Sequence, residues 1–252
     1  MGAILPGPTF RKSTRLRRKQ KYRTYTDGWR NSKVSEERVR KVVRELKNVK
    51  SCGPKGVYAE MLKHGTDKLI KMLTWVIDRC LNGEEAAQQW KVAYISSIHK
   101  KGSKKDCSNY RGISVTCVMS RLCGKILRDL IEEENKDEVE QSGFRTGRSC
   151  TVNIFCMKQI IKKRNATNQE THLLFVDFTK AYDSISISKL WEVLGESNIN
   201  STLIKALQNL YGNTAQVKTG NILSHPFNIT KGLRPGCCIF PILFKIYIRK
   251  GL

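Results

Sequence analysis

The sequence predicts an α+β fold, in which helices are interspersed with a few strands along 252 residues. Three observations support this prediction. Apolar residues recur at helical spacing in long segments, such as 118–134, where Leu122, Ile126 and Leu127 share one face. Short runs typical of strands lie between these segments, and Val92–Ile98 is the clearest of them. Polar, glycine-containing stretches separate the runs, and no internal repeat is present.

Caps, periodicity and turn residues predict the elements in order. A helix begins after Ser35, which can cap it, and further helices are expected at about 58–63, 69–81, 118–134, 151–164 and 201–211. Strands are expected at 92–98 and 110–115, joined by a polar segment. Gly220 and Asn221 predict a hairpin between 216–219 and 227–230, and an apolar helix continues to Ile248. No domain boundary is predicted after about residue 34.

Composition and charge limit the class of protein. The chain has 40% hydrophobic and 27% charged residues, which is ordinary for a globular domain. No apolar run reaches the ~20 residues needed to cross a bilayer. The net charge is +24, and the first 50 residues carry half of this excess. It favours a polyanionic partner such as nucleic acid, although for residues 1–34 a flexible basic arm is an equally good interpretation.

The nine cysteines argue against a secreted or zinc-binding protein. Their number is odd, they form no Cys-x-x-Cys pair, and the four histidines make no zinc-ligand spacing with them. The N-terminus does not resemble a secretory signal, because Pro6 and Pro8 interrupt it. We therefore expect a reduced compartment, nucleus or cytoplasm, and no membrane insertion. Cys237 and Cys238 are expected to be small buried thiols, with a reactive pair as the alternative.

The stretch from Leu173 to Ser184 is central to the prediction. Its apolar run is too short for a helix and predicts a buried strand that ends at Asp177. A carboxylate at the end of a rigid strand could bind a divalent cation. An ordinary turn is the alternative, because aspartate is common where strands end. After Ser184 the pattern becomes helical, with one apolar face formed by Leu190, Trp191 and Leu194.

Four blocks together carry a resemblance to one family. They are Asn109–Ser114, Ser142–Ser149, Val176–Ser184 and Thr230–Cys237, in that order. From about residue 35 to its end, the chain resembles the reverse transcriptase domain of non-LTR, LINE-like retrotransposons, of the type that joins an endonuclease to the polymerase. The resemblance implies an RNA-directed DNA polymerase. Residues 35–252 would form the fingers and part of the palm of its right-hand fold, without the thumb.

The resemblance also implies a metal centre and a nucleic-acid path. Asp177 matches the first catalytic aspartate, and with the backbone carbonyl of Phe178 it would bind Mg²⁺ in a two-metal mechanism of nucleotidyl transfer. Arg145 and Arg148 lie in a basic, glycine-spaced loop. Two roles remain open for them: contacts to the backbone of the RNA template or DNA primer, or capping of a turn.

Further positions match contacts to the incoming deoxynucleoside triphosphate. Tyr182 matches the aromatic residue that stacks beneath the sugar. Arg111 matches a residue of the fingers that contacts the phosphates, for which a planar guanidinium is suited. Lys100 or Lys101 matches a second phosphate contact. Asp183 matches a family signature position near the site rather than a metal ligand.

The sequence departs from the family pattern at several positions. It ends at Leu252, before the expected aromatic-x-Asp-Asp motif, and contains no Asp-Asp pair. One catalytic aspartate in place of three predicts very weak Mg²⁺ binding. Pro235 stands where glutamine is usual, Phe240 where serine is usual, and Lys55 where aspartate is usual.

These departures leave three hypotheses for the function. The first is a reverse transcriptase domain that is catalytically inactive as this chain. The second is a non-catalytic basic module that binds RNA, DNA or an RNA–DNA hybrid. The third is a translated retroelement fragment without function, with exposed apolar surface and poor solubility.

Overall fold

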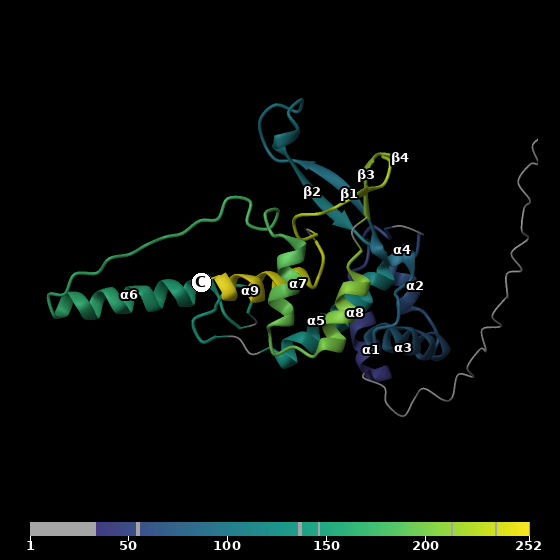
Figure 1. Cartoon of the computed structure of the whole chain (residues 1–252), viewed down its shortest axis with the longest axis horizontal. Helices are drawn as coiled ribbons and strands as arrows, with labels where there is room; N and C mark the ends of the chain where they lie inside the picture. Colours follow the sequence, from purple (N-terminus) through teal and green to yellow (C-terminus); the bar gives the residue numbers. More distant parts are fainter. Residues whose placement is uncertain are drawn as a thin grey trace, which may run out of the picture. The chain divides into compact units, whose positions relative to one another are not determined.

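The computed structural model describes residues 34–251, except residues 54, 55, 136, 137, 146, 213 and 235. The predicted basic arm up to residue 33, together with Lys55 and Pro235, therefore lies outside the described residues. Helices and a mixed sheet are both present, which confirms a mixed α and β fold (Figure 1). Within the described part of the chain, no helix is long and apolar enough to cross a membrane.

Four helices pack against one another around the main core. They are α1 (Glu36–Arg44), α3 (Asp67–Leu81), α5 (Val118–Glu134) and α8 (Ser201–Leu210). The short helix α2 (Ala59–Lys63) contacts α1, and α4 (Gln88–Lys91) contacts α5 and α8. Helix α7 (Ile187–Gly195) contacts both α8 and the C-terminal helix α9 (Phe240–Gly251). Except for α4, which was not predicted, the expected positions of these helices are confirmed.

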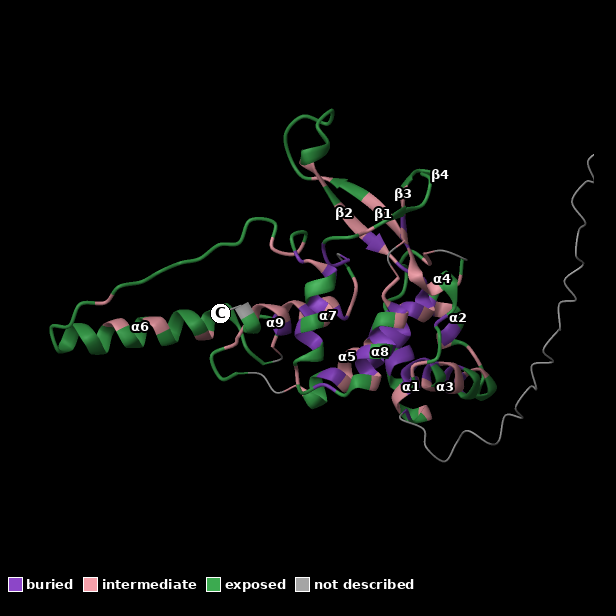
Figure 2. Cartoon of the chain, in the orientation of Figure 1, coloured by how far each residue is buried: buried purple, intermediate pink, exposed green. Residues whose placement is uncertain are grey.

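Local signals account for where the helices begin and which face they bury. The hydroxyl of Ser35 accepts a hydrogen bond from the N–H of Arg38 in the first turn of α1. Oδ1 of Asn200 accepts one from the N–H of Thr202 at the start of α8. Side chains at helical spacing then meet in one core (Figure 2), whose largest members include Ile77, Leu81, Leu122, Ile126, Leu127, Leu190, Leu194 and Leu207.

The sheet has the strand order β2-β1-β3-β4, with β5 also paired to β3. Its strands are β1 (Val92–His99), β2 (Tyr110–Val115), β3 (Thr214–Thr219), β4 (Ile222–Leu223) and β5 (Phe227–Asn228). β1 and β2, the two strands predicted on either side of a polar segment, are antiparallel. β1 and β3 are parallel, and the predicted turn at Gly220 and Asn221 joins β3 to β4.

The prediction of a buried strand at Leu173–Asp177 is wrong. Residues 169–178 form neither helix nor strand, and Leu174, Phe175 and Val176 are 89%, 77% and 65% exposed. The preceding helix, α6 (Cys150–Ala166), has no buried residue (Figure 2). Among the described residues no strand pairs with this segment. A strand needs a neighbour to satisfy its backbone hydrogen bonds, so the apolar run alone does not fix its structure.

Candidate functional site

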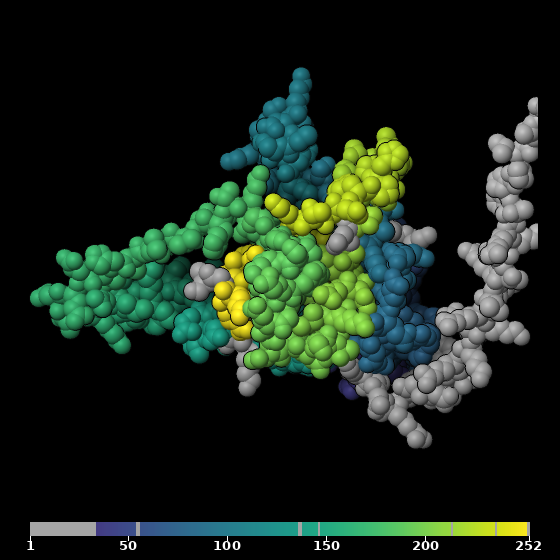
Figure 3. Space-filling model, viewed as in Figure 1, coloured from purple at the N-terminus to yellow at the C-terminus, as the bar shows by residue number. Residues whose placement is uncertain are grey.

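Three segments that are distant in sequence surround a pocket of about 830 Å³. The first runs from β1 through the following loop to β2, the second is the turn around residues 180–183, and the third is the segment 229–240 that leads into α9. Figure 3 shows the first of them in teal, the second in green and the third in yellow-green on one face. Pairing within the sheet fixes the base of the first segment, where the N–H of Lys100 donates to the carbonyl of Asn109 at 2.8 Å.

Backbone hydrogen bonds connect the second segment to the third. The N–H of Gly232 donates to the carbonyl of Ile185 at 2.8 Å, and that of Leu233 donates to the carbonyl of Tyr182 at 3.0 Å. Gly232 has a φ of +86°, and a Cβ atom there would lie 3.2 Å from both Cα and the carbonyl oxygen of Asp183. This contact therefore favours glycine, and it fixes Tyr182 and Asp183 at the edge of the pocket.

The pocket lining is strongly cationic. It includes five cationic side chains, from Lys100, Arg111, Lys180, Lys231 and Arg234, and one carboxylate, from Asp183. Such an excess of positive charge around a concave surface raises the local concentration of anions. A polyanion is therefore the class of ligand that the pocket favours.

Arg234 differs from the other cations because it is only 4% exposed. Its Nη2 donates to the carbonyl of Lys91 at 2.9 Å, and its Cζ lies 5.1 Å from the centre of the Tyr211 ring. Its backbone N–H donates to the Tyr211 hydroxyl at 3.0 Å. Burial raises the pKa of Tyr211 to about 12, so the phenol stays neutral at physiological pH. Burial also lowers the pKa of Arg234 from its usual range.

Aromatic rings form another wall of the pocket. The ring centre of Tyr182 lies 4.5 Å from that of Phe240 and 4.5 Å from that of Phe244. Phe144 approaches Tyr182 edge-on at 6.3 Å. Burial raises the pKa of Tyr182, and the positive charge of Arg111 opposes this rise. The neighbouring rings hold Tyr182 in place, so Tyr182 and Phe240 give the pocket a firm apolar surface.

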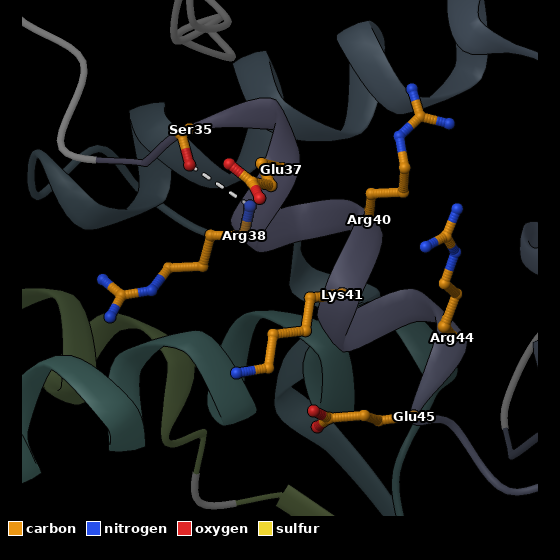
Figure 4. Close-up of a pocket in the computed structure, with 7 residues that line it drawn as sticks. All are labelled: Ser35, Glu37, Arg38, Arg40, Lys41, Arg44 and Glu45. Atoms are coloured by element: carbon orange, nitrogen blue, oxygen red, sulfur yellow. Dashed lines mark hydrogen bonds between the residues drawn. The ribbon is translucent and has the colours of Figure 1, made fainter.

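A second hollow, on helix α1, lacks these features. Figure 4 shows its lining, which consists of Ser35, Glu37, Arg38, Arg40, Lys41, Arg44 and Glu45. All of these residues belong to one helix and its two caps, and two of the arginines are already paired. Arg38 forms an ion pair with Glu133 of α5. Arg40 forms one with Asp67 of α3 at 2.9 Å.

Residues 98–252 match the model of one known family, described as reverse transcriptase (RNA-dependent DNA polymerase). This match covers more than half of the chain and includes nearly the whole pocket lining. The chain belongs to the reverse transcriptase family. The LINE-like resemblance of the four sequence blocks is thereby confirmed, since relatives from transposons are found as well.

Several curated proteins are similar to this reverse transcriptase chain. A probable RNA-directed DNA polymerase from transposon X-element of Drosophila melanogaster is 24% identical over 219 residues, which cover 83% of this chain and 24% of the relative. A second from transposon BS of the same organism is 25% identical over 222 residues, with the same coverage of both chains. A retrovirus-related Pol polyprotein from a type-2 retrotransposable element of Drosophila melanogaster is 21% identical, covering 80% of this chain and 19% of the relative. The chain thus spans about a quarter of the length of these relatives or less.

The fold of this reverse transcriptase brings together three of the residues that the sequence singled out. Lys100, Arg111 and Tyr182 all line the pocket, and Asp183 lies beside them. Lys101 does not line it. Of these two adjacent lysines only Lys100 lines the pocket, and the phosphate contact itself stays a prediction.

The predicted metal ligands lie elsewhere. Asp177 and Phe178 do not line the pocket and belong to the exposed segment 169–178. Over the described ranges there is no group of three His, Cys, Asp or Glu side chains suited to a metal ion. Two divalent ions need several carboxylates, so the described side chains do not fit the two-metal centre that the family implies.

The two arginines of the glycine-spaced loop also lie outside the pocket. Nη1 of Arg145 donates to the carbonyl of Glu138 at 2.8 Å. The N–H of Arg148 donates to the carbonyl of Arg145 at 3.2 Å, and Arg148 itself is exposed. Arg145 thus contacts a local turn, while the side chain of Arg148 remains accessible to a ligand.

The sequence analysis missed three cations of the site, namely Lys180, Lys231 and Arg234. All three lie within the blocks that carried the family resemblance, and this was the signal available in the sequence. Nothing local distinguishes Arg234 from an exposed arginine. Its burial depends on Tyr211 and on the carbonyl of Lys91, which come from other parts of the chain.

Proposed function

We propose that residues 35–252 form the fingers and the first half of the palm of a right-hand RNA-directed DNA polymerase. The pocket would bind the incoming deoxynucleoside triphosphate. The observation that carries this proposal is the convergence of Lys100, Arg111 and Tyr182 on one pocket. A guanidinium and an ammonium group suit phosphate oxygens, and an aromatic wall suits the sugar and base. The volume of about 830 Å³ is in the range of small-molecule sites.

Titration with a fluorescent deoxynucleoside triphosphate tests the nucleotide site. The substitution Arg111→Ala should weaken binding about tenfold or more, because hydrogen bonds to charged groups are among the stronger ones. Lys104→Ala is the control, since this exposed lysine of the loop between β1 and β2 does not line the pocket. Equal losses in the two variants would contradict a specific site and leave only general electrostatic attraction.

We propose further that this 252-residue polypeptide, taken alone, binds nucleotide but does not extend a primer. The candidate ligands for Mg²⁺, Asp177 and the carbonyl of Phe178, lie on an exposed segment outside the pocket. A single carboxylate cannot offset the charge of two divalent ions. The test is primer extension on an RNA template with Mg²⁺ or Mn²⁺, beside Asp177→Ala. Extension that disappears in the Asp177→Ala variant would overturn the proposal.

A second candidate function is non-catalytic binding of RNA, DNA or an RNA–DNA hybrid in the nucleus or cytoplasm. The observation that favours it is the composition of α6, which has no acidic residue and carries four exposed cations in its second half, Lys158, Lys162, Lys163 and Arg164. Together with the net charge of +24, this favours contacts to nucleic-acid phosphates. Affinity for single-stranded RNA should fall steeply with salt, with a log–log slope of roughly three or more. A flat salt response would contradict this function.

A further inference from the structure

Arg234 carries a positive charge that the fold buries without an anionic partner. It is 4% exposed, whereas Lys100, Arg111, Lys180 and Lys231 are exposed at the pocket mouth. No carboxylate forms an ion pair with it in the described part of the chain. Removing a charge from water without such a partner is unfavourable, so the position is unusual for a purely structural arginine.

Neutral groups orient the guanidinium of Arg234. Nη2 donates to the carbonyl of Lys91, and the ring of Tyr211 lies against its plane. Nε and Nη1 make no hydrogen bond to any other described residue. Two groups that act on its charge can become negative: the phenol of Tyr211, which stays neutral at physiological pH, and the thiol of Cys237, whose pKa is lowered to about 7, first by a hydrogen bond from Cys238. This thiol is only partly ionised at neutral pH, and it does not line the pocket.

We propose that Arg234 is a phosphate-binding residue, whose guanidinium donates to a phosphate group of a nucleoside triphosphate in the pocket. The inference rests on the proposed nucleotide site and adds its most buried contact. A small ligand can insert a phosphate beside a buried side chain, whereas the backbone phosphates of RNA or DNA would meet the exposed lysines. The planar guanidinium suits two oxygens of one phosphate, and its fixed orientation reduces the entropy lost on binding.

Burial makes the contribution of Arg234 distinguishable from that of the exposed cations. Salt screens charges at the surface, but it screens a buried pair much less. The contribution of Arg234 to triphosphate affinity should therefore persist at high salt, whereas that of Lys231 should decrease. The contribution should also increase with the number of phosphates on the ligand.

The experiment is calorimetric titration of the whole chain with deoxyadenosine mono-, di- and triphosphate, at low and high salt. Arg234→Met removes the charge and retains an apolar stem. It should lose about tenfold or more in triphosphate affinity at both salt concentrations, and its affinity should increase less with the number of phosphates than that of the parent chain. Lys231→Gln is the matched control, and it should lose a factor of about three at low salt only. Arg234→Lys should bind less tightly than the parent chain, because a point charge lacks the planar fork.

Thermal melting separates a binding role from a structural one. The parent chain should melt at a higher temperature with triphosphate, and Arg234→Met should show a smaller increase at the same triphosphate concentration while still melting cooperatively without ligand. If Arg234→Met does not fold, Arg234→Lys provides the same comparison. Either folded variant with the affinity of the parent chain would overturn the inference and leave the nucleotide site intact. No triphosphate binding by the parent chain would instead refute the proposed function.

A single-stranded RNA oligonucleotide distinguishes the source of the phosphate. Arg234→Met should bind it as tightly as the parent chain does. A loss of RNA affinity equal to the loss of triphosphate affinity would assign Arg234 to the nucleic-acid backbone and overturn its role in nucleotide binding.

Discussion

Replacing Gly232 by alanine tests whether the pocket depends on the close contact between two chain segments. Gly232 lies where the segment before α9 crosses the turn that carries Tyr182 and Asp183, and its N–H donates to Ile185. Its φ of +86° is unfavourable for any residue with a Cβ atom. The added Cβ would also lie 3.2 Å from Cα and the carbonyl oxygen of Asp183, and backbone atoms cannot rotate away as a side chain would.

In Gly232→Ala, the positive φ and the close contact with Asp183 should together lower the free energy of unfolding by about 2 to 3 kcal/mol. The left-handed backbone contributes roughly 1 to 2 kcal/mol, and the tight contact contributes about 1 kcal/mol more. Gly220→Ala is the matched control. Gly220 also has a positive φ, of +59°, but a Cβ there would meet nothing within 4 Å. Only the backbone effect, about 1 kcal/mol, is expected for it.

Urea denaturation followed by circular dichroism measures both losses, and a triphosphate titration measures the pocket. Gly232→Ala should weaken nucleotide binding, because the positions of Tyr182 and Asp183 change, whereas Gly220→Ala should not. Equal stability losses would refute the role of the contact with Asp183. An unchanged nucleotide affinity in a folded Gly232→Ala variant would refute the link between this contact and the pocket.

Three other substitutions or reactions give simpler tests. Tyr211→Phe removes the acceptor of the Arg234 N–H and should cost about 1 to 2 kcal/mol in urea denaturation; an unchanged stability would mean that another group accepts this bond. Phe175→Ser should change stability by less than about 0.5 kcal/mol, because the side chain is largely exposed, and it should reduce aggregation in light scattering. Undiminished aggregation would show that this segment is not its cause. The lowered pKa of Cys237, about 7, predicts that its alkylation by iodoacetamide slows as the pH falls below 7 and levels off above it, as followed by mass spectrometry beside Cys237→Ser. A rate that still rises steeply well above pH 7 would contradict this pKa.

The sequence by itself determined the helices other than α4, the first two strands, the hairpin turn at Gly220 and the family. These features depend on neighbours in the chain. The apolar face of α1, formed by Val39, Val42 and Val43, repeats at helical spacing, and Ser35 caps the same helix. Arg111 and Tyr182 were found because the motif blocks contain them, whereas Lys100, with Lys101 as its alternative, was matched to the family outside these blocks. The fold brings Lys100, Arg111 and Tyr182 together at one pocket.

Only the tertiary structure decided whether the apolar run before Asp177 forms a strand and whether Arg234 is buried. The run before Asp177 satisfies every local condition for a strand, but no described strand lies beside it to accept its hydrogen bonds. Arg234 is buried because Tyr211 and Lys91 reach it from other segments. Strand pairing and burial depend on which distant segments meet in space. Periodicity and helix caps depend on residues a few positions apart, so these two features can be judged from the sequence alone.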